Sequence, residues 1–155
     1  MTEAVLELKD VCFRWPNQDR ATIDLPELKI DQGERIFLQG PSGSGKSTLL
    51  SLVGGILVAE SGSLRVLGEE LKSLSRARRD AFRVTHLGFI FQLFNLLPYL
   101  SLEENVLLPL RFSKKRAQRA GSNQAERLKE AQRRLTALGP GSYTHLRAHE
   151  TVSVR

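Results

Sequence analysis

The sequence predicts an α/β fold, with a P-loop core, an antiparallel β portion on its N-terminal side and a partial helical subdomain after it. Three observations predict this fold class. Short apolar runs bounded by turn residues indicate strands in the N-terminal half. A glycine-rich loop at residues 40–45 separates a predicted strand from a predicted helix. Beyond residue 100, Ser and Asn stand at capping positions ahead of segments with helical periodicity.

Strands are predicted in five short segments: 6–9, 23–30, 35–39, 63–67 and 87–91. The first alternates apolar and polar residues, which is typical of a half-buried strand. Pro26 lies inside the second and places that strand at a sheet edge, because proline has no N–H for the ladder. Residues 35–39 and 87–91 are short, mostly apolar runs, consistent with buried strands.

Helices are predicted where capping residues precede helical periodicity. One begins near Lys46, and another covers residues 75–83 with Ser75 as its N-cap. Ser101 and Glu104 have capping-box spacing, which predicts a helix from there to about residue 110. Asn123 caps a longer helix that ends before Gly139, since glycine commonly follows a helix C-terminus.

Composition is that of one domain: 155 residues, 41% of them hydrophobic, with no apolar stretch as long as the ~20 residues of a membrane span. The N-terminus has no secretory-signal pattern, and the single cysteine, Cys12, suits a reducing cytoplasm.

The net charge is +6. Much of the excess lies in two clusters in predicted exposed helices: Arg76, Arg78 and Arg79, and Lys114, Lys115, Arg116 and Arg119. No aromatic residues interleave with them, so a solvated surface is expected and a nucleic-acid partner is not.

Residues 40–48 match the phosphate-loop pattern G-x-x-x-x-G-K-[ST] at every fixed position. Glycines allow positive φ and close approach of backbone N–H groups to an anion, and the following helix adds its N-terminus. The predicted contacts of ATP are Gly40, Ser42, Gly43, Ser44, Gly45, Lys46, Ser47 and Thr48. Lys46 reaches the β- and γ-phosphates, and the Ser47 hydroxyl binds Mg²⁺. The alternative is a Gly/Ser-rich linker ahead of a helix.

Two separated blocks resemble the ATP-binding subunits of ABC transporters. The first is formed by residues 40–50, 54–55 and 61–62. The second is Leu-Gly-Phe-Ile-Phe-Gln at 87–92, followed by Asn-Leu-Leu-Pro at 95–98 and Ser-Leu-Glu-Glu-Asn-Val at 101–106. The resemblance runs from about residue 6 to 139, and it is closest to the lipoprotein-release and macrolide-export type.

The resemblance implies roles for further residues. Trp15 falls where that family stacks an aromatic ring on adenine; Phe13 is a competing candidate, and simple packing beside Pro16 is the alternative. Gln92 matches the Q-loop glutamine, which binds Mg²⁺ or holds the attacking water, so Lys46 and Gln92 are the predicted catalytic residues. Residues 93–105 would face a membrane permease at the inner face of the cell membrane, and the full-length parent would pair as a homodimer.

The family's Walker B carboxylates, signature motif and switch histidine are not found in the sequence. Residues 1–141 are therefore expected to form a partial nucleotide-binding domain of a parent ATPase, and this chain alone is expected not to hydrolyse ATP. Residues 142–155 have no periodicity, and 142–151 resemble a translated sequencing adapter. Our hypothesis is read-through from a gene fragment into a disordered tail, against a natural divergent C-terminus. Other functions left open are another P-loop NTPase or small kinase, and a non-catalytic nucleotide-binding module.

Overall fold

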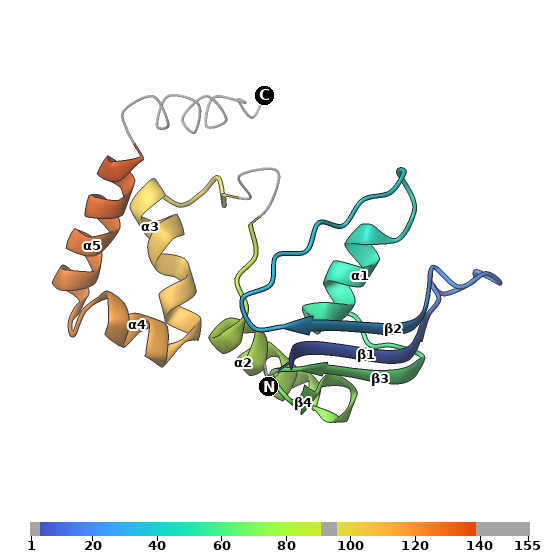
Figure 1. Ribbon diagram of the computed structural model, residues 1–155. Helices are drawn as coiled ribbons and strands as arrows, with labels where there is room; N and C mark the ends of the chain where they lie inside the picture. The colour runs from blue at the N-terminus through green and yellow to red at the C-terminus, as the bar shows by residue number, and fades with distance from the viewer. Residues whose placement is uncertain (1–3, 91–95, 139–155) are drawn as a thin grey trace, which may run out of the picture. The chain divides into compact units, whose positions relative to one another are not determined.

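The computed structural model describes residues 4–90 and 96–138 and divides the chain into two compact units between Arg83 and Val84 (Figure 1). The first unit contains a sheet and helices. Its elements are β1 (Ala4–Phe13), β2 (Ile23–Asp31), α1 (Lys46–Val53), β3 (Ser61–Val66), β4 (Glu69–Glu70), the 3₁₀ helix η1 (Leu71–Ser73) and most of α2 (Arg76–His86), which runs past the boundary at Arg83. Each predicted helix in this unit is present, and Ser75 Oγ accepts a hydrogen bond from the Arg78 N–H at the start of α2.

The sheet has the strand order β2-β1-β3-β4, and every neighbouring pair is antiparallel. β2, which contains Pro26, is an edge strand, as the sequence predicts. Helix α1 is steeply inclined to the strands of the sheet in Figure 1, and its Leu52 is buried, as are Leu8 and Val11 of β1. The predicted antiparallel β portion is therefore confirmed, and α1 completes a two-layer core.

Strand β1 changes its side-chain phase within its length. Leu8 and Val11 are both fully buried although they are three residues apart, whereas strict alternation would put them on opposite faces. The change occurs at Asp10, where φ is +51° and the pairing with β3 shifts by one residue between Lys9 and Cys12. This β-bulge keeps both halves of β1 facing the core.

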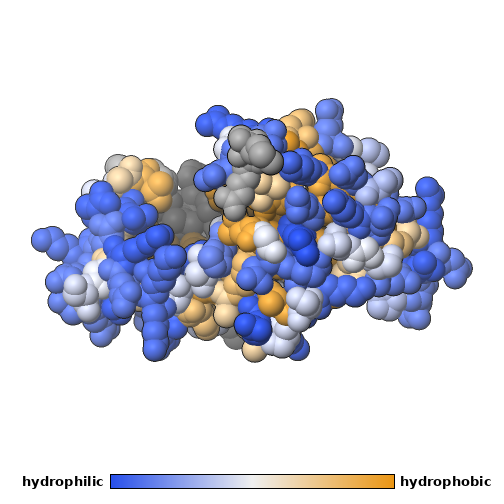
Figure 2. Space-filling view, turned by 60° about the horizontal axis from the view of Figure 1, so that its bottom comes forward, coloured by the Kyte–Doolittle hydropathy of each residue, from blue (hydrophilic) through white to orange (hydrophobic). Residues whose placement is uncertain are grey.

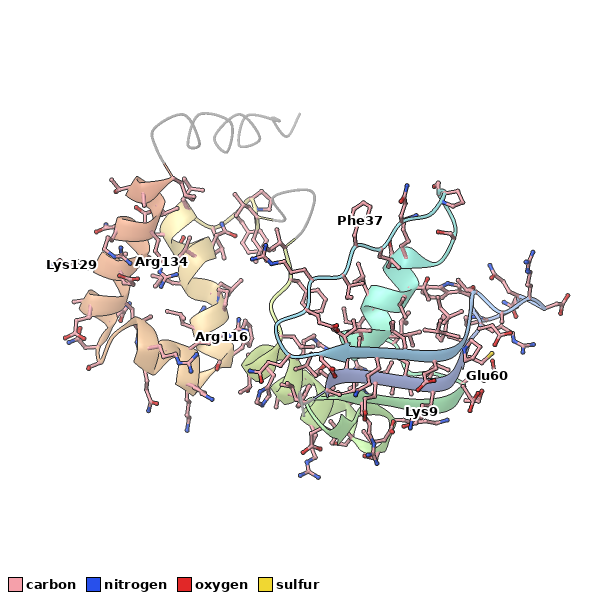
Figure 3. All side chains as sticks on the ribbon, in the orientation of Figure 1. Lys9, Phe37, Glu60, Arg116, Lys129 and Arg134 are labelled. Carbon is pink, nitrogen blue, oxygen red and sulfur yellow. The ribbon has the colours of Figure 1, made fainter. Side chains whose placement is uncertain are left out.

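Two predicted strands are wrong. Residues 35–39 have no regular structure, and Phe37, which is 85% exposed, points away from the sheet (Figure 3). Residues 87–90 also lack strand structure, and Ile90 is fully exposed; residue 91 lies outside the described residues. An apolar run predicts burial, but a buried strand also needs neighbours for its backbone hydrogen bonds. Among the described residues no strand pairs with either segment.

Beyond residue 100 the described part of the second unit is mostly helical. It consists of α3 (Leu102–Leu107), the 3₁₀ helix η2 (Leu108–Phe112), α4 (Lys114–Ala120) and α5 (Gln124–Ala137). Asn123 caps α5 by accepting a hydrogen bond from the Glu126 N–H, and α5 ends at Ala137, as the sequence predicts. The expected tail, residues 142–155, lies outside the described residues.

The capping box predicted at Ser101 is present. The Glu104 N–H donates to Ser101 Oγ at 3.2 Å, and the Ser101 N–H donates to Glu104 Oε2 at 2.7 Å. The Ser101 backbone N–H, followed by its hydroxyl, holds the pKa of Glu104 below its ordinary 4.5. A lowered carboxyl pKa means that this contribution to stability is present above pH 4.5 and is lost as pH falls through the folded-state pKa.

Replacing Ser101 with alanine is expected to lower the free energy of unfolding of the helical unit by about 1 kcal/mol, because the Glu104 N–H loses its acceptor. Urea unfolding followed by circular dichroism measures the change. Ser122→Ala is the matched control, since among the described residues the Ser122 hydroxyl has no hydrogen-bond partner. Equal losses in the two variants would contradict a capping role for Ser101.

Candidate nucleotide-binding site

The glycine-rich loop is a compact turn that leads directly into α1. The Ser44 N–H donates to the Pro41 carbonyl at 3.3 Å, and helical bonding begins where the Leu49 N–H donates to the Gly45 carbonyl at 2.8 Å. Gly43 and Gly45 have backbone φ angles of +80° and +88°, values that residues other than glycine rarely adopt. The glycines therefore allow the turn to close just ahead of the helix N-terminus.

Gly45 also packs against the start of β2. A Cβ atom at Gly45 would lie 2.8 Å from the Thr22 carbonyl oxygen and 2.9 Å from Ile23 Cδ1. Only a residue without a side chain allows the loop to approach the sheet this closely. This contact brings the segment between β1 and β2 next to the loop.

Lys46, the first residue of α1, folds back over the loop. Its Nζ donates to the Gly40 carbonyl at 2.7 Å, to the Pro41 carbonyl at 2.6 Å and to Ser44 Oγ at 3.2 Å. Three oxygen acceptors thus hold the ammonium group beside the turn. The positive charge lies next to the backbone that the sequence predicts as the phosphate contact.

A cavity of about 440 Å³ lies beside this loop. Its lining residues come from the segment between β1 and β2 and from the loop with the start of α1: Trp15, Gln18, Thr22, Ser42, Gly43, Gly45, Lys46, Ser47 and Thr48. The volume is within the usual range of small-molecule sites. Gly40 and Ser44 are not in its lining; they contact Lys46 instead.

Trp15 and Phe13 have different environments. Phe13 is buried in β1, whereas Trp15 is 40% exposed and lines the cavity. The two rings meet edge to face, with centroids 5.2 Å apart and planes at 86°, a favourable aromatic geometry. Phe13 therefore packs against the Trp15 ring, and of these two rings Trp15 is the one that lines the cavity.

Sequence reasoning missed Gln18 and Thr22, which also line the cavity. The Gln18 N–H donates to the Trp15 carbonyl at 3.1 Å, closing a turn that puts Gln18 on the same wall. Its only signal in the sequence is the short spacing after Trp15 in a polar turn. Gln92, the predicted Q-loop residue, lies outside the described residues. Within residues 4–90 and 96–138, no group of three or more His, Cys, Asp or Glu side chains could hold a metal ion.

A glycine turn and a lysine that line a cavity at a helix N-terminus, on an α/β scaffold, define a P-loop nucleotide-binding domain. A family profile described as "ABC transporter" matches residues 24–153. The chain belongs to the ABC transporter family, as an ATP-binding domain. This sets aside a small kinase or another class of P-loop NTPase.

The similar curated proteins include ATP-binding proteins of the macrolide-export and lipoprotein-release type, which is the type that the sequence resembles. The chain is 41% identical over 141 residues to the macrolide export ATP-binding/permease protein MacB of Bradyrhizobium diazoefficiens. It is 41% identical over 130 residues to the lipoprotein-releasing system ATP-binding protein LolD 2 of Rhodospirillum rubrum. These matches cover 90% and 83% of this chain, and the chain spans 20% and 56% of the two relatives' own lengths.

Solved structures give the same family. A dimeric post-hydrolysis structure of the ATP-binding cassette MJ0796, with ADP and phosphate bound, is similar with a TM-score of 0.70 and 32% identity. The similarity covers 83% of this chain and 54% of that cassette. The predicted fold class, a partial ABC ATPase domain, is confirmed. Across the described residues, no helix has both the length and the apolar character needed to cross a membrane.

Proposed function

We propose that this chain binds ATP with Mg²⁺ in the cavity beside residues 40–48, and that its parent protein couples ATP hydrolysis to transport by a membrane permease. One observation carries the proposal: a single cavity joins an exposed aromatic ring, Trp15, to the phosphate-loop residues Lys46 and Ser47. A flat ring, and in the same lining a cation with a hydroxyl, suit the base and the phosphates of a nucleoside triphosphate. The lining contains the ring, the glycines and the hydroxyls that such a ligand needs.

In this proposal each group acts on a particular part of the ligand. The Trp15 ring stacks on adenine, and the Gly43 and Gly45 backbone allows close approach of the phosphates. Lys46 exchanges loop oxygens for phosphate oxygens, and Ser47 supplies one Mg²⁺ ligand. Few protein ligands are expected, because Mg²⁺ keeps several waters and phosphate oxygens. Gln92 is proposed to complete the metal site or to position the attacking water.

Membership of the ABC transporter family also supports proposals for the activity and the partners of the whole protein. We propose that residues 93–105 contact the permease at the inner face of the membrane. Tyr99, 76% exposed, supports this contact, and Asn105 orders the preceding turn through hydrogen bonds with the Leu97 backbone. After Gln92 no apolar run of the sequence ends in Asp-Glu, so we propose that this chain does not hydrolyse ATP without further residues of a homodimeric parent.

Trp15 is the only tryptophan, so its fluorescence reports directly on the proposed adenine contact. Adding Mg·ATP to the chain is expected to quench this fluorescence as the base stacks on the ring. Trp15→Ala is expected to weaken binding of a fluorescent ATP analogue about tenfold, a stacking loss of ~1.4 kcal/mol.

Inorganic tripolyphosphate is the matched control ligand, because it has the phosphates and lacks the base. It is expected to compete with ATP without quenching Trp15. Quenching by tripolyphosphate alone would contradict adenine stacking. No competition between ATP and tripolyphosphate would contradict the phosphate site itself.

A further inference from the structure

The positive charge of the chain is concentrated in the helical unit. Residues 1–83 have twelve Lys and Arg and twelve Asp and Glu, a formal charge of zero. Residues 96–138 have nine Lys and Arg and only four Asp and Glu, a formal charge of +5. Hydrophilic side chains cover most of this unit on the face drawn in Figure 2. ATP binding in the first unit does not use this charge.

Part of that charge surrounds a groove between α3, α4 and α5. The groove has a volume of about 270 Å³. Its apolar floor consists of Val106, Leu107, Leu110, Ala120 and Ala131. Its charged rim consists of Arg116, Arg119, Arg127, Arg134 and Glu130.

The rim arginines form two rows that follow from helix geometry. Arg116 and Arg119 are three residues apart on α4, and Arg127 and Arg134 are seven apart on α5. Residues at these spacings share a helix face. Figure 3 shows Arg134 on the side of α5 toward α3, while Lys129 lies on the other side of α5. The two rows start from the two helices that flank the apolar floor. Arg127 reaches across to α4, where its Nε donates to the Ala117 and Gly121 carbonyls, and Arg116 donates to the Leu87 carbonyl.

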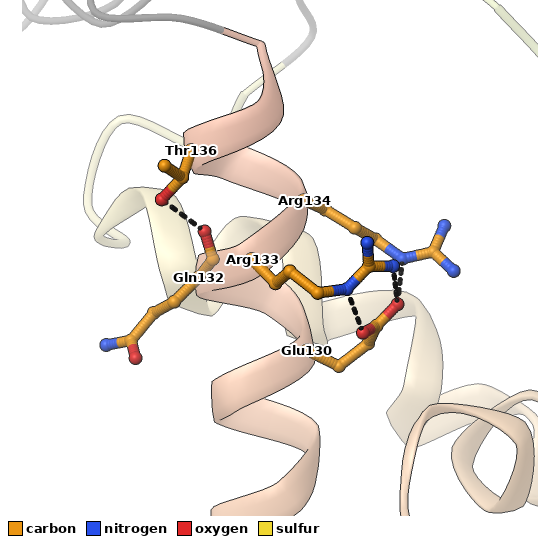
Figure 4. A network of polar contacts seen from close by, with 5 residues as sticks. All are labelled: Glu130, Gln132, Arg133, Arg134 and Thr136. Carbon is orange, nitrogen blue, oxygen red and sulfur yellow. Dashed lines mark hydrogen bonds and ion pairs between the residues drawn. The ribbon is translucent and has the colours of Figure 1, made fainter.

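Glu130 is the one carboxylate among the described residues that line the groove, and arginine side chains already donate hydrogen bonds to it. Glu130 accepts hydrogen bonds from the Arg133 and Arg134 side chains at 2.7–2.8 Å (Figure 4). These bonds, Arg133 first, lower the pKa of Glu130 to about 2, so it stays ionised at neutral pH. Arg119 has no polar partner anywhere in residues 4–90 and 96–138. The rim therefore has more cationic groups than its own carboxylate can neutralise.

A second hollow adjoins the groove. Its volume is about 420 Å³, and it shares Leu107, Leu110 and Arg127 with the first. Its remaining lining consists of Leu100, Leu108, Arg111, Gln124 and Glu104, the carboxylate of the Ser101 capping box. The two hollows together offer a row of leucine side chains along η2, with Arg111, Arg127 and the Ser101-bound Glu104 beside it.

We propose that this groove binds an acidic amphipathic segment of a partner protein, with apolar side chains on the floor and carboxylates against the two arginine rows. In helix-in-groove recognition the bound helix presents apolar anchors at spacings of three, four and seven residues, and an apolar floor between helices is the surface that receives them. Guanidinium groups pair with carboxylates in a bidentate geometry that lysines do not match.

The shape of the site favours a peptide over other anions. A membrane surface is flat and is bound by protruding side chains, whereas these leucines and alanines form the bottom of a hollow. A nucleic acid would leave the apolar floor empty, and among the described residues no aromatic side chain lines the groove for base stacking. Charge complementarity together with an apolar floor identifies the occupant as both acidic and amphipathic.

The test uses the 155-residue chain and a fluorescein-labelled helical peptide of about 18 residues, with leucines on one face and glutamates flanking them. Anisotropy is expected to show binding that weakens with added NaCl. Arg119→Glu is expected to weaken it about tenfold, because it reverses a rim charge. Lys129→Glu, the same charge change on the far side of α5, is expected to change it less than about twofold.

Several results would overturn the proposal. Equal effects of Arg119→Glu and Lys129→Glu would leave only nonspecific charge attraction. Equal binding of a scrambled peptide, or of one with serine in place of leucine, would exclude the apolar floor. Tighter binding of phosphatidylserine vesicles or duplex DNA, with the same Arg119→Glu sensitivity, would assign the surface to those partners. Self-association abolished by Arg119→Glu in sedimentation would assign it to a second copy of the chain.

Discussion

Gly62→Ala is expected to destabilise the sheet-containing unit by about 4 kcal/mol, the largest effect of a single methyl group in this fold. Gly62 has φ of +83°, and a Cβ there would lie 2.2 Å from the Asp10 carbonyl oxygen and 2.6 Å from that of Lys9. These neighbours are backbone atoms of the β1 bulge and cannot rotate away. Relief of the clash would displace the bulge that keeps Leu8 and Val11 in one core.

Gly68→Ala separates this clash from ordinary backbone strain. Gly68 also has positive φ, +78°, but a Cβ there meets nothing within 4 Å. Gly68→Ala is expected to lower the free energy of unfolding by only ~1–2 kcal/mol, the conformational cost of a left-handed residue. Urea unfolding followed by Trp15 fluorescence compares both variants with the parent chain. Equal destabilisation by the two substitutions would show that close approach at Gly62 contributes nothing.

The helices were predictable because their signals are local. Ser75, Ser101 and Asn123 all cap as predicted, since a cap depends on residues only three positions away. The edge position of β2 followed from Pro26 for the same reason. The bulge at Asp10 was not predicted, because it depends on the partner strand: Gly62, about fifty residues later, allows the approach.

The strands predicted at 35–39 and 87–91 show where sequence reasoning fails. An apolar run records that a segment avoids water, but it does not name the strands that would pair with it. Phe37 and Ile90 are exposed, and no strand among the described residues pairs with either segment. The chain spans about half of the MJ0796 cassette, so its own residues supply about half of such a domain.

The candidate site was predictable where a motif has fixed spacing. The loop glycines, Lys46 and Ser47 follow from one pattern, and the structure brings them to one cavity. The resemblance added Trp15, which lines the same cavity. Gln18 and Thr22 could not be predicted, because their place depends on the turn after Trp15 and on the contact between Gly45 and Thr22.

Lys46→Ala is expected to weaken Mg·ATP binding about 100-fold, a loss of ~2.7 kcal/mol for one cation that contacts phosphate. The Lys46 ammonium already lies beside the loop, where the Gly40 and Pro41 carbonyls accept its hydrogen bonds, so binding needs only a local exchange of these acceptors for phosphate oxygens. Alanine removes both the charge and this positioning. Titration with a fluorescent ATP analogue, or by calorimetry, measures the change.

Lys72→Ala is the matched control, because the Lys72 Nζ also donates to a backbone carbonyl, that of Glu60, at 2.9 Å, and Lys72 does not line the nucleotide cavity. It removes one positive charge from the same unit and is expected to change ATP affinity less than about twofold. Lys46→Arg distinguishes charge from geometry: a planar guanidinium cannot occupy the compact place of the ammonium, so affinity is expected to stay well below that of the parent chain. Full affinity in Lys46→Arg would mean that a diffuse positive charge is sufficient, and full affinity in Lys46→Ala would show that the phosphates bind elsewhere.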